Sequence, residues 1–439
     1  VACSKRGSNF ARPSLLGFLY QDWMECSADS QTAAVDETSR PTVLVAGAGI
    51  AGLSLALFLE RRGTCNVRLF ERSPDLSPAL GAHYGLNGAL ECLDRAGLHH
   101  VWAPLLNNLE HMHFRSTGSP LKFKFNLHKA MDGTEFEGKF GAFMRGEFQT
   151  SLAEALPPGI LECGKEIVDV QEGAHKVHIS FADGSSAEGD ILVAADGINS
   201  LVRGLVFPEM RKVYAGYKCW YLIHNDPPPD VFKNAMTELR SKDAITMVFS
   251  AGRPSKHVVL VVKRAPEEPT REELELGALP EQFNQIYTEC GAYKAGLVTE
   301  EKLQAATRLL HFALYNMPPG ATTWSRGRVC LLGDAAHATT PFIGQGANQA
   351  VQSAFCLARL LHERGIDDYH GIFEEAHSIR EPPTSNVITT SAALGGIRVP
   401  SVEEGCLHGF RRFFSYAMLH VLPAKFWGRR LAKAMQVRV

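Results

Sequence analysis

The chain has 439 residues, of which 45% are hydrophobic and 21% charged, and its formal net charge is −2. This length predicts about two domains of an ordinary globular protein, and the charge argues against a nucleic-acid partner. The ten cysteines are scattered singly without a C-x-x-C pair, so neither a metal site nor a disulfide framework is indicated.

Residues 1–40 predict a disordered extension. Lys5, Arg6 and Arg12 precede the first acidic residue, which is compatible with an organelle-targeting peptide, but the polar stretch 27–40 favours disorder. No apolar run reaches the roughly 18 residues that a membrane-spanning helix needs. We therefore expect a cytoplasmic protein, with organelle targeting or peripheral membrane association as alternatives.

The first ordered segment predicts a strand at 42–46, a helix at 53–62 that ends at Gly63, and a second strand at 66–70. Gly47, Gly49 and Gly52 lie in the first turn, where glycines allow a tight bend and close approach of a pyrophosphate. Glu71 follows the second strand, about 20 residues beyond the glycines, where an acid accepts hydrogen bonds from a ribose. Together these features indicate a dinucleotide-binding βαβ unit.

The next segments alternate between sheet and helix. A helix is expected at 87–96, and residues 109–125 read as strands in which His111 and His113 are surface residues rather than metal ligands. Arg145 lies at a strand-to-helix junction, which suits a phosphate or ribose contact. Residues 177–181 and 190–194 predict a hairpin about 182–184, and Asp196-Gly197 follows its second strand, where α/β folds bind ligands.

The remainder divides into three parts. Residues 213–310 predict further strands without a nucleotide motif, which suits a substrate-binding sheet. A buried strand then leads to Gly333-Asp334 and to a helix that starts at Gly346, and the bare amino end of such a helix favours an anionic or electron-rich group. Beyond residue 361 we expect helices broken at Pro382-Pro383. For the basic, aromatic end we favour packing on the main domain over a membrane-surface helix.

With these motifs together, the chain resembles the group A FAD-dependent monooxygenases, the aromatic hydroxylases of the p-hydroxybenzoate and salicylate hydroxylase type. Three motifs carry the resemblance: the glycine turn with Glu71, the segment Ala195-Asp196-Gly197 with Arg203, and Gly333-Asp334 with Gly344-Gln-Gly-Ala-Asn348. The resemblance implies an α/β fold with a discontinuous Rossmann-like FAD-binding domain, an inserted mixed-sheet substrate domain and a C-terminal helical region. The expected FAD-binding parts are 41–108, 143–210 and 322–362, the substrate parts are 109–142 and 211–321, and the helical region is 363–439.

The resemblance also implies roles. Glu71, with Arg72 beside it, would hold the adenosine ribose, and the glycine turn would hold the pyrophosphate. Arg145 would contact FAD, Asp334 would bind a ribityl hydroxyl, and Asp196 and Arg203 would bridge FAD and a transient NADPH or NADH. Gly346, Ala347 and Asn348 would place backbone N–H groups at the flavin pyrimidine edge, where reduction loads negative charge. Oxygen would then react through a flavin C4a-hydroperoxide.

Two departures from the family pattern bear on the substrate. In the loop Gly81-Ala82-His83-Tyr84-Gly85 an imidazole replaces a small residue, so His83 could tune the flavin, act as a base, link covalently to FAD, or only pack. On the substrate strand Tyr221 stands where many relatives carry an arginine that would clamp a carboxylate. Tyr221 could donate a hydrogen bond to substrate or be a core aromatic.

We therefore expect an NAD(P)H- and O2-dependent monooxygenase that hydroxylates or epoxidises a mostly neutral aromatic, polyketide, terpenoid or indole-type secondary metabolite. The alternatives are an FAD-dependent dehydrogenase or halogenase, although the W-x-W-x-I-P stretch of tryptophan halogenases does not occur. A non-catalytic FAD-fold carrier for a prenylated partner is the third reading.

Overall fold

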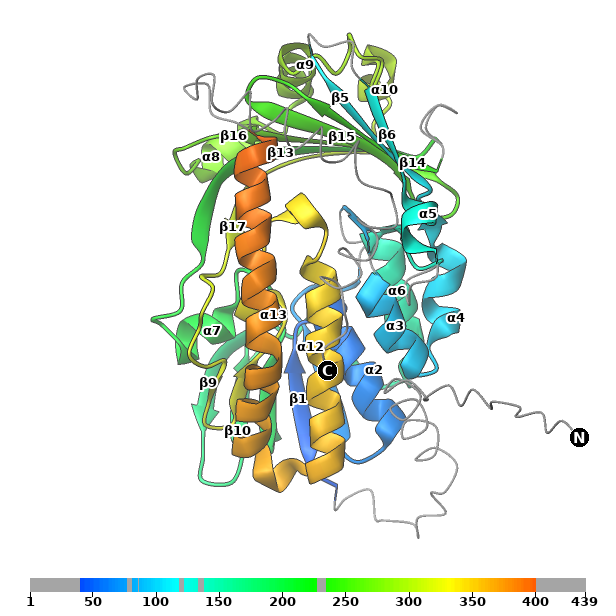
Figure 1. The fold of residues 1–439 in the computed structure, drawn as a ribbon. Coiled ribbons are helices and arrows are strands. Elements are labelled where there is room, and N and C mark those ends of the chain that lie inside the picture. The colour runs from blue at the N-terminus through cyan, green and yellow to red at the C-terminus, as the bar shows by residue number, and fades with distance from the viewer. Residues whose placement is uncertain are drawn as a thin grey trace, which may run out of the picture.

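The computed structural model describes residues 40–76, 81–85, 87–117, 122–132, 138–226 and 234–399. A six-stranded sheet with its helices forms the lower part in Figure 1, and a seven-stranded sheet arches over it. Residues 1–39 of the expected extension 1–40, and the basic, aromatic end at 410–431, lie outside the described residues. No helix in the described ranges is long and apolar enough to cross a membrane.

The six-stranded sheet is mainly parallel and carries the expected βαβ unit at its centre. Its strands lie in the order β18 (Ser325–Arg326), β19 (Val329–Leu331), β12 (Ile191–Ala194), β1 (Thr42–Ala46), β2 (Asn66–Glu71) and β8 (Leu161–Cys163). All neighbours run parallel except β18 and β19. The carboxyl ends of β1, β12 and β19 therefore meet at one edge, which is where such sheets bind ligands.

Two long helices pack against each other beside this sheet. Helix α2 (Ile50–Arg62) follows β1 and ends at Gly63, whose φ of +62° is the left-handed conformation expected of a helix-ending glycine. Helix α12 (Gly346–Arg364) packs along α2, and the rings of Phe58 and Phe355 meet edge to face with centroids 5.3 Å apart. The smaller helices α3 (Asn87–Arg95), α4 (His99–Trp102) and α6 (Arg145–Glu154) share the hydrophobic core of this layer, whereas α7 (Leu201–Val206) and α11 (Asp334–His337) pack in the core on the other face of the sheet.

The expected hairpin of residues 177–181 with 190–194 was wrong. Strand β10 (Val177–Phe181) instead pairs with β11 (Ser186–Gly189) and with β9 (Ile167–Glu172) in a separate three-stranded sheet. The sequence 186–189 alternates exposed and buried side chains as an edge strand does, whereas Ile191–Ala194 is buried throughout. A fully buried strand needs cover on both faces, so it pairs with β1 in the parallel sheet.

The seven-stranded sheet is antiparallel apart from one pair. Its order is β17 (Arg308–Asn316), β13 (Val213–His224), β16 (Lys256–Arg264), β15 (Ala244–Ala251), β14 (Ala235–Arg240), β5 (His111–Ser116) and β6 (Lys122–Asn126). Strand β5 pairs parallel with β14, so His111 and His113 lie within the sheet. Helices α8 (Arg271–Leu276), α9 (Pro280–Glu289) and α10 (Glu300–Gln304) follow β16, and the outer face of the sheet packs on α9 and α10.

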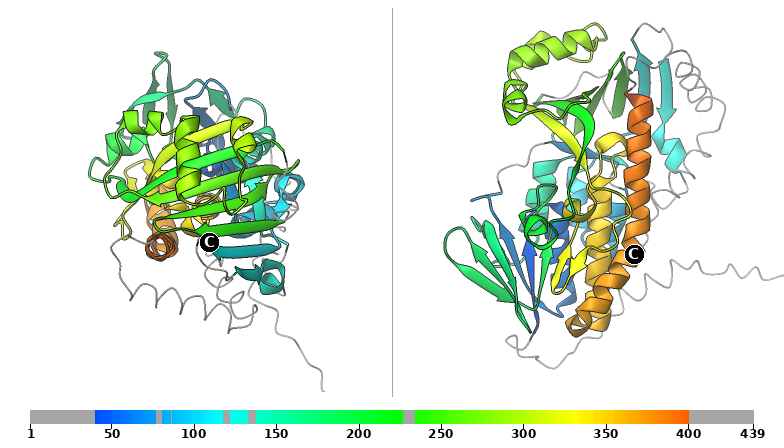
Figure 2. Two further views of the ribbon diagram at one scale, coloured as in Figure 1. Left: turned by 90° about the horizontal axis from the view of Figure 1, so that it is seen from above. Right: turned by 90° about the vertical axis from the view of Figure 1, so that its left-hand side faces the viewer.

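The inner face of this sheet is apolar and turns toward the six-stranded sheet (Figure 2). We use "inner face" for its buried, inward side chains, which are Tyr217, Cys219, Tyr221, Met236, Ile245, Met247, Phe249, Val258, Leu260 and Val262. They share one hydrophobic cluster with Phe342, which belongs to the 3-10 turn η4 (Pro341–Ile343). The inner face and the parallel sheet thus meet through this turn.

A three-stranded sheet and one long helix tie the two parts together. The small sheet has the order β3 (Ala82–Tyr84), β7 (Gly141–Met144) and β4 (Asn107–Asn108), and α5 (Leu127–Met131) follows β6. Further 3-10 turns are η2 (Ala103–Leu105) and η5 (Ile366–Asp368). Helix α13 (Tyr369–Arg398) packs on α12 and runs from the lower part up to the inner face (Figure 1).

The expected break at Pro382-Pro383 was also wrong, because α13 continues through both prolines. A proline inside a helix removes a backbone hydrogen bond and costs about 3 kcal/mol. Apolar side chains of the helix are buried both before and after the prolines, for example Phe373 before them and Val387 after them. Tertiary packing of these apolar residues outweighs the local cost.

Candidate active site

The glycine turn after β1 is too tightly packed to accept side chains. Gly47 has φ of +96°, and a Cβ there would lie 2.7 Å from the carbonyl oxygen of Ala195. A Cβ on Gly52 would lie 2.0 Å from the carbonyl oxygen of Gly47. By contrast, a Cβ on Gly49 would lie 3.9 Å from the Ala195 carbonyl oxygen, which is an ordinary contact. Packing within the protein therefore does not require glycine at position 49. Gly49 lines a pocket at the carboxyl edge of the parallel sheet (the central pocket), where the absence of a side chain allows close approach by a ligand.

Glu71 lies at the end of β2 beside this turn. Its Oε2 accepts a hydrogen bond from the Ala48 N–H at 2.9 Å, and its Oε1 accepts one from the Ser73 N–H at 3.0 Å. Glu71 and Arg72 line a second pocket together with Gly47, Lys165 and Asp196. The structure thus places the acid next to the glycine turn, and its contact with a ribose stays a prediction.

Asp196 and Arg203 both make hydrogen bonds to the protein backbone. The Asp196 Oδ2 accepts hydrogen bonds from the N–H groups of Leu201 (2.9 Å) and Val202 (3.2 Å), while its buried Oδ1 has no hydrogen-bond partner among the described residues. The buried Arg203 donates to the carbonyls of Ala335 at 2.9 Å and Ile198 at 2.6 Å, and burial lowers its pKa. Arg203 therefore braces α11 against the loop after β12, and cofactor contact by either residue stays a prediction.

The central pocket opens at the carboxyl edge of the parallel sheet. Its lining combines the glycine turn, the start of α6 and the segment from α11 to α12: Gly49, Ile50, Ala51, Arg145, Ala195, Gly197, Asp334, Thr339, Thr340, Pro341, Gly344, Gly346, Ala347 and Ala350. Most of these residues have no side chain or a very small one. The backbone therefore forms most of the wall.

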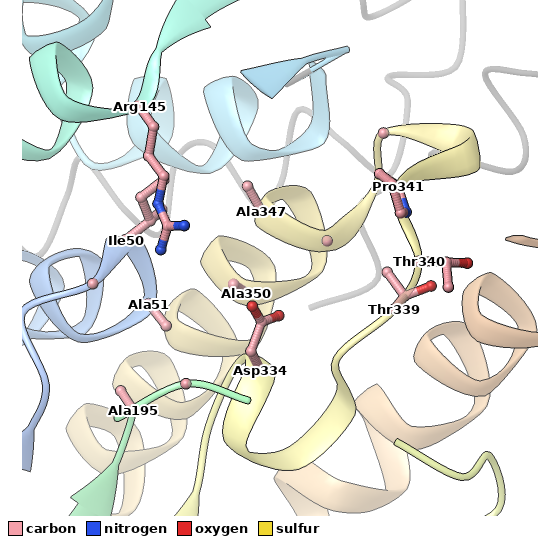
Figure 3. A pocket seen from close by; sticks show the side chains of 14 residues that line it. Ile50, Ala51, Arg145, Ala195, Asp334, Thr339, Thr340, Pro341, Ala347 and Ala350 are labelled. Atoms are coloured by element: carbon pink, nitrogen blue, oxygen red, sulfur yellow. The ribbon is translucent and has the colours of Figure 1, made fainter. Parts of the chain in front are cut away.

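Two ionisable side chains project into this space. Figure 3 shows Arg145 reaching down from α6 and Asp334 pointing up from α11 into the same space. The Asp334 side chain is exposed in the pocket, and partial loss of water at this site raises its pKa, against an opposing effect of the Arg145 charge. Arg145 is exposed in the pocket and thus available to an anionic ligand.

The start of α12 forms the far wall. Gly344 has φ of +63° and ends the turn η4, and α12 begins at Gly346 with no acidic residue in its first turn. Ala347 and Ala350 line the pocket, so the unpaired N–H groups of this helix end are near the ligand space. Such an end stabilises negative charge.

Asn348 has a structural task that its sequence position did not reveal. It is fully buried, its Oδ1 accepts from the Ala89 N–H at 2.9 Å, and its Nδ2 donates to the Gly85 carbonyl at 2.6 Å. It thereby ties α12 to α3 and to the end of β3. The predicted role of Asn348, through its backbone N–H, is compatible with this side-chain anchor.

The loop containing His83 contributes a backbone strand. Ala82 and His83 pair with Met144 and Phe143 of β7, and the Gly85 N–H donates to the Gly141 carbonyl at 2.9 Å. The side chains of Ala82 and His83 lie outside what the structure describes. The ideas that His83 tunes, assists or covalently binds the flavin therefore stay predictions.

Sequence reasoning missed three residues of the site: two threonines in the pocket wall and one glutamine behind the glycine turn. Thr339 and Thr340 line the central pocket without belonging to a motif. Gln149 donates from Nε2 to the Ala48 carbonyl at 2.6 Å and so supports the glycine turn. Its spacing of four residues from Arg145, on one helix face, could have revealed it.

Tyr221 lies on the inner face, 6% exposed. Its neighbour Tyr217 meets the ring of Phe342 edge to face, with centroids 5.0 Å apart. Trp220 points to the opposite side and stacks on His311, with centroids 4.4 Å apart. Because Pro341 lines the central pocket and Phe342 packs on Tyr217, one short turn separates the pocket from the inner face.

Comparisons with known proteins agree with this geometry. The profile of the family described as FAD binding domain matches residues 40–382. The 2-heptyl-3-hydroxy-4(1H)-quinolone synthase of Pseudomonas aeruginosa (strain UCBPP-PA14) is 32% identical over 324 residues, covering 73% of this chain and 80% of that protein. The 6-hydroxynicotinate 3-monooxygenase of Pseudomonas fluorescens is 28% identical over 356 residues, covering 79% and 89%.

A solved structure extends the likeness to the fold. The crystal structure of Klebsiella pneumoniae HpxO complexed with FAD and uric acid aligns with a TM-score of 0.74 at 21% identity. The alignment covers 90% of this chain and 96% of that chain, so both sheets are included.

Proposed function

The chain belongs to the group A flavin monooxygenase family with its FAD binding domain, and on that premise we propose that it hydroxylates a neutral aromatic molecule with NAD(P)H and O2. The observation that carries the proposal is the position of η4. Its Pro341 borders the FAD pocket, and its Phe342 packs on Tyr217 of the inner face. A substrate held against the inner face would lie next to the cofactor.

The residues of the central pocket fit FAD. Gly47 and Gly52 keep the turn tight, because a Cβ at either position would meet the protein's own backbone, while Gly49 lines the pocket without a side chain, which suits close approach of a pyrophosphate. Arg145 offers a cation, Asp334 offers an acceptor for hydroxyl groups, and the start of α12 offers N–H groups. When bound, FAD would supply hydride acceptance from the nicotinamide and activation of oxygen.

The protein's own contribution would be binding, orientation and charge stabilisation. The amino end of α12 stabilises negative charge at the neighbouring end of a flavin, because its N–H groups carry partial positive charge. Asp334 would fix the ribityl chain through hydrogen bonds. The inner face would exclude water from the reacting centre, because its side chains are buried and apolar.

The inner face supports a neutral, largely apolar substrate. The buried charges of Glu238 and Arg398, beside Met247 of this face, are paired with each other. A carboxylate substrate would need a cation as its partner, whereas the inner face consists mainly of apolar and aromatic side chains. The relative named for a heptyl-hydroxyquinolone makes a quinolone or a similar bicyclic nitrogen heterocycle with an apolar substituent the first candidate.

The test is to reconstitute the protein with FAD and follow NADPH and NADH oxidation with a panel of neutral quinolones, indoles and phenols. Benzoate and salicylate serve as acidic comparison compounds. We expect a neutral compound to accelerate oxidation and to yield a product heavier by one oxygen atom. The FAD-poor variant Asp334→Ala is the control. NADPH oxidation that yields peroxide with every neutral compound, or product only from the acids, would contradict the proposal.

A further inference from the structure

Helix α13 supports the pocket turn from behind at two points. The Thr340 hydroxyl and the Ser391 hydroxyl are 2.8 Å apart, and Ser391 Oγ also donates to the Thr340 carbonyl at 2.7 Å. At Gly395 the helix backbone lies against the Phe342 ring, because a Cβ there would be 2.5 Å from that ring. The turn is therefore held by the helix and not only by its own chain.

Arg398, the last residue of α13, joins this turn to the seven-stranded sheet. Its guanidinium donates to the Phe342 carbonyl and to the Glu238 carboxylate of β14, and it lies 3.4 Å from the Met247 Sδ. Arg398 is 9% exposed and Glu238 only 1%. One side chain thus contacts a pocket turn, a sheet carboxylate and an inner-face methionine.

Two arginines share one buried carboxylate at this point. Glu238 also accepts from the Arg240 Nε at 2.7 Å. Burial by itself would raise the pKa of Glu238, but the charges of Arg398 and Arg240 outweigh it, so its pKa is lowered. The carboxylate is therefore ionised at neutral pH and holds both arginines.

A second arginine of the sheet holds the residue that follows α13. Arg264 of β16 donates from Nε at 3.2 Å and from Nη2 at 2.7 Å to the Val399 carbonyl. Its guanidinium also lies 5.4 Å from the ring centroid of Tyr217. The end of α13 is thus fixed to two strands of the sheet.

We propose that Arg398 is a positioning residue, which clamps the turn Pro341–Ile343 between α13 and the inner face and so sets the spacing between FAD and substrate. The matched family span ends at residue 382, so Ser391, Gly395 and Arg398 all lie beyond it. The part of the proposal that concerns substrate rests on the proposed function. The part that concerns FAD does not.

The chain contains a matched arginine for comparison. Arg326 also donates to a backbone carbonyl, that of Val206, and to a carboxylate, that of Glu209 at 2.6 Å. Its side chain is 51% exposed, and it does not line the central pocket. Exposed pairs of this kind contribute little to stability, so Arg326→Met controls for the loss of an arginine–carboxylate pair.

The experiment compares wild type, Arg398→Met, Arg398→Lys and Arg326→Met by titrating apoprotein with FAD and recording fluorescence and the visible spectrum. Arg398→Met should weaken FAD binding about tenfold, as loss of a charged buried hydrogen bond does, and alter the bound-flavin spectrum. Arg398→Lys should recover part of both, and Arg326→Met should match wild type. With a turnover substrate, Arg398→Met should form less product per NADPH oxidised.

Wild-type FAD affinity and spectrum in a folded Arg398→Met protein would overturn the proposal, even if its melting temperature fell. If Arg398→Met does not fold, Glu238→Gln decides the question. It should weaken FAD binding about threefold with the same spectral change, and unchanged affinity would overturn the clamp. The FAD titration needs no substrate, so a failure to find any hydroxylated product counts against the proposed function and leaves the clamp supported.

Discussion

The central pocket and the inner face lie on opposite sides of the same short turn, yet their walls consist of different kinds of residue. The pocket is walled by backbone, glycine and alanine, with Arg145 and Asp334 as its ionisable side chains. The inner face is walled by large apolar side chains such as Tyr221, Met247 and Phe249, brought together from separate strands.

This difference determines how specifically each region can recognise a cofactor or a substrate. A wall of backbone recognises one cofactor through N–H groups and close approach, and it tolerates few substitutions. A wall of side chains can change its shape with each substitution while the sheet stays the same. Relatives that share the FAD-binding sequence are accordingly named for different aromatic compounds.

The largest expected effect comes from adding one methyl group to the pocket wall. In Gly52→Ala the new Cβ would lie 2.0 Å from the Gly47 carbonyl oxygen, so the turn or the helix must move. We expect destabilisation by about 3 kcal/mol and FAD binding weakened more than about 100-fold. Absorbance of bound flavin and the melting temperature of the apoprotein measure this.

The control for that prediction is Gly204→Ala, because a Cβ at Gly204 meets nothing within 4 Å. It should keep wild-type flavin content. A Gly52→Ala protein with wild-type flavin content and melting temperature would show that the pocket wall is not rigid backbone.

Asp334→Ala should have the next largest effect. It removes the carboxylate that opens on the pocket and leaves the backbone wall intact. Loss of charged hydrogen bonds to FAD should weaken binding about 30-fold, with little change in apoprotein stability. Isothermal titration of apoprotein with FAD measures it, and Asp367→Asn, at the distant η5, is the control. Equal affinities would remove Asp334 from the binding site.

Some features of the fold could be predicted from the sequence alone, and others depend on tertiary packing. The βαβ unit and the turn before α12 were predictable because glycine spacing and apolar periodicity are local. The hairpin at 177–194 was misread because the choice between an edge strand and a central strand depends on what covers the strand. The continuity of α13 through Pro382-Pro383 depends equally on tertiary packing.

The clamp at Arg398 could not have been predicted, because its partners Glu238 and Phe342 are far from it in sequence and belong to no motif. Tyr221 was found only through a departure from a family pattern. Its neighbours on the inner face come from different strands, so their common surface appears only in the folded chain.

A pH titration compares two buried histidines, one behind the pocket and one on the outer face of the large sheet, where it contacts Lys302 of α10. Burial lowers the pKa of His337, behind the pocket, to about 3, and lowers that of His257, on the large sheet, to about 3. A histidine with a depressed folded pKa contributes stability above its unfolded pKa of about 6.5, and this is lost as the pH falls toward 3. Between pH 7 and 5 each should cost about 2 kcal/mol of unfolding free energy.

Urea unfolding of apoprotein at pH 7, 6 and 5 measures this loss. His337→Gln and His257→Gln should each flatten the dependence on pH by a similar amount. A wild-type slope in either variant would mean that the corresponding imidazole becomes protonated in the folded protein.

The smallest expected effect is on the inner face. Tyr221→Phe removes only a hydroxyl, so FAD affinity should not change, while the KM for a neutral aromatic substrate should rise about fivefold. Tyr315→Phe, at an exposed pair with Glu268, is the control. An unchanged KM would make Tyr221 a packing residue, and a change in FAD affinity would break the separation between the two regions.

The central claim is that FAD in the pocket delivers oxygen to a neutral aromatic molecule on the inner face. The most direct measurement supplies the FAD-reconstituted protein with NADPH, a neutral quinolone and isotopically labelled O2, and weighs the product. The account predicts a product that carries one labelled oxygen atom, formed in step with NADPH oxidation. A product without label, or NADPH oxidation that yields only peroxide, would contradict it.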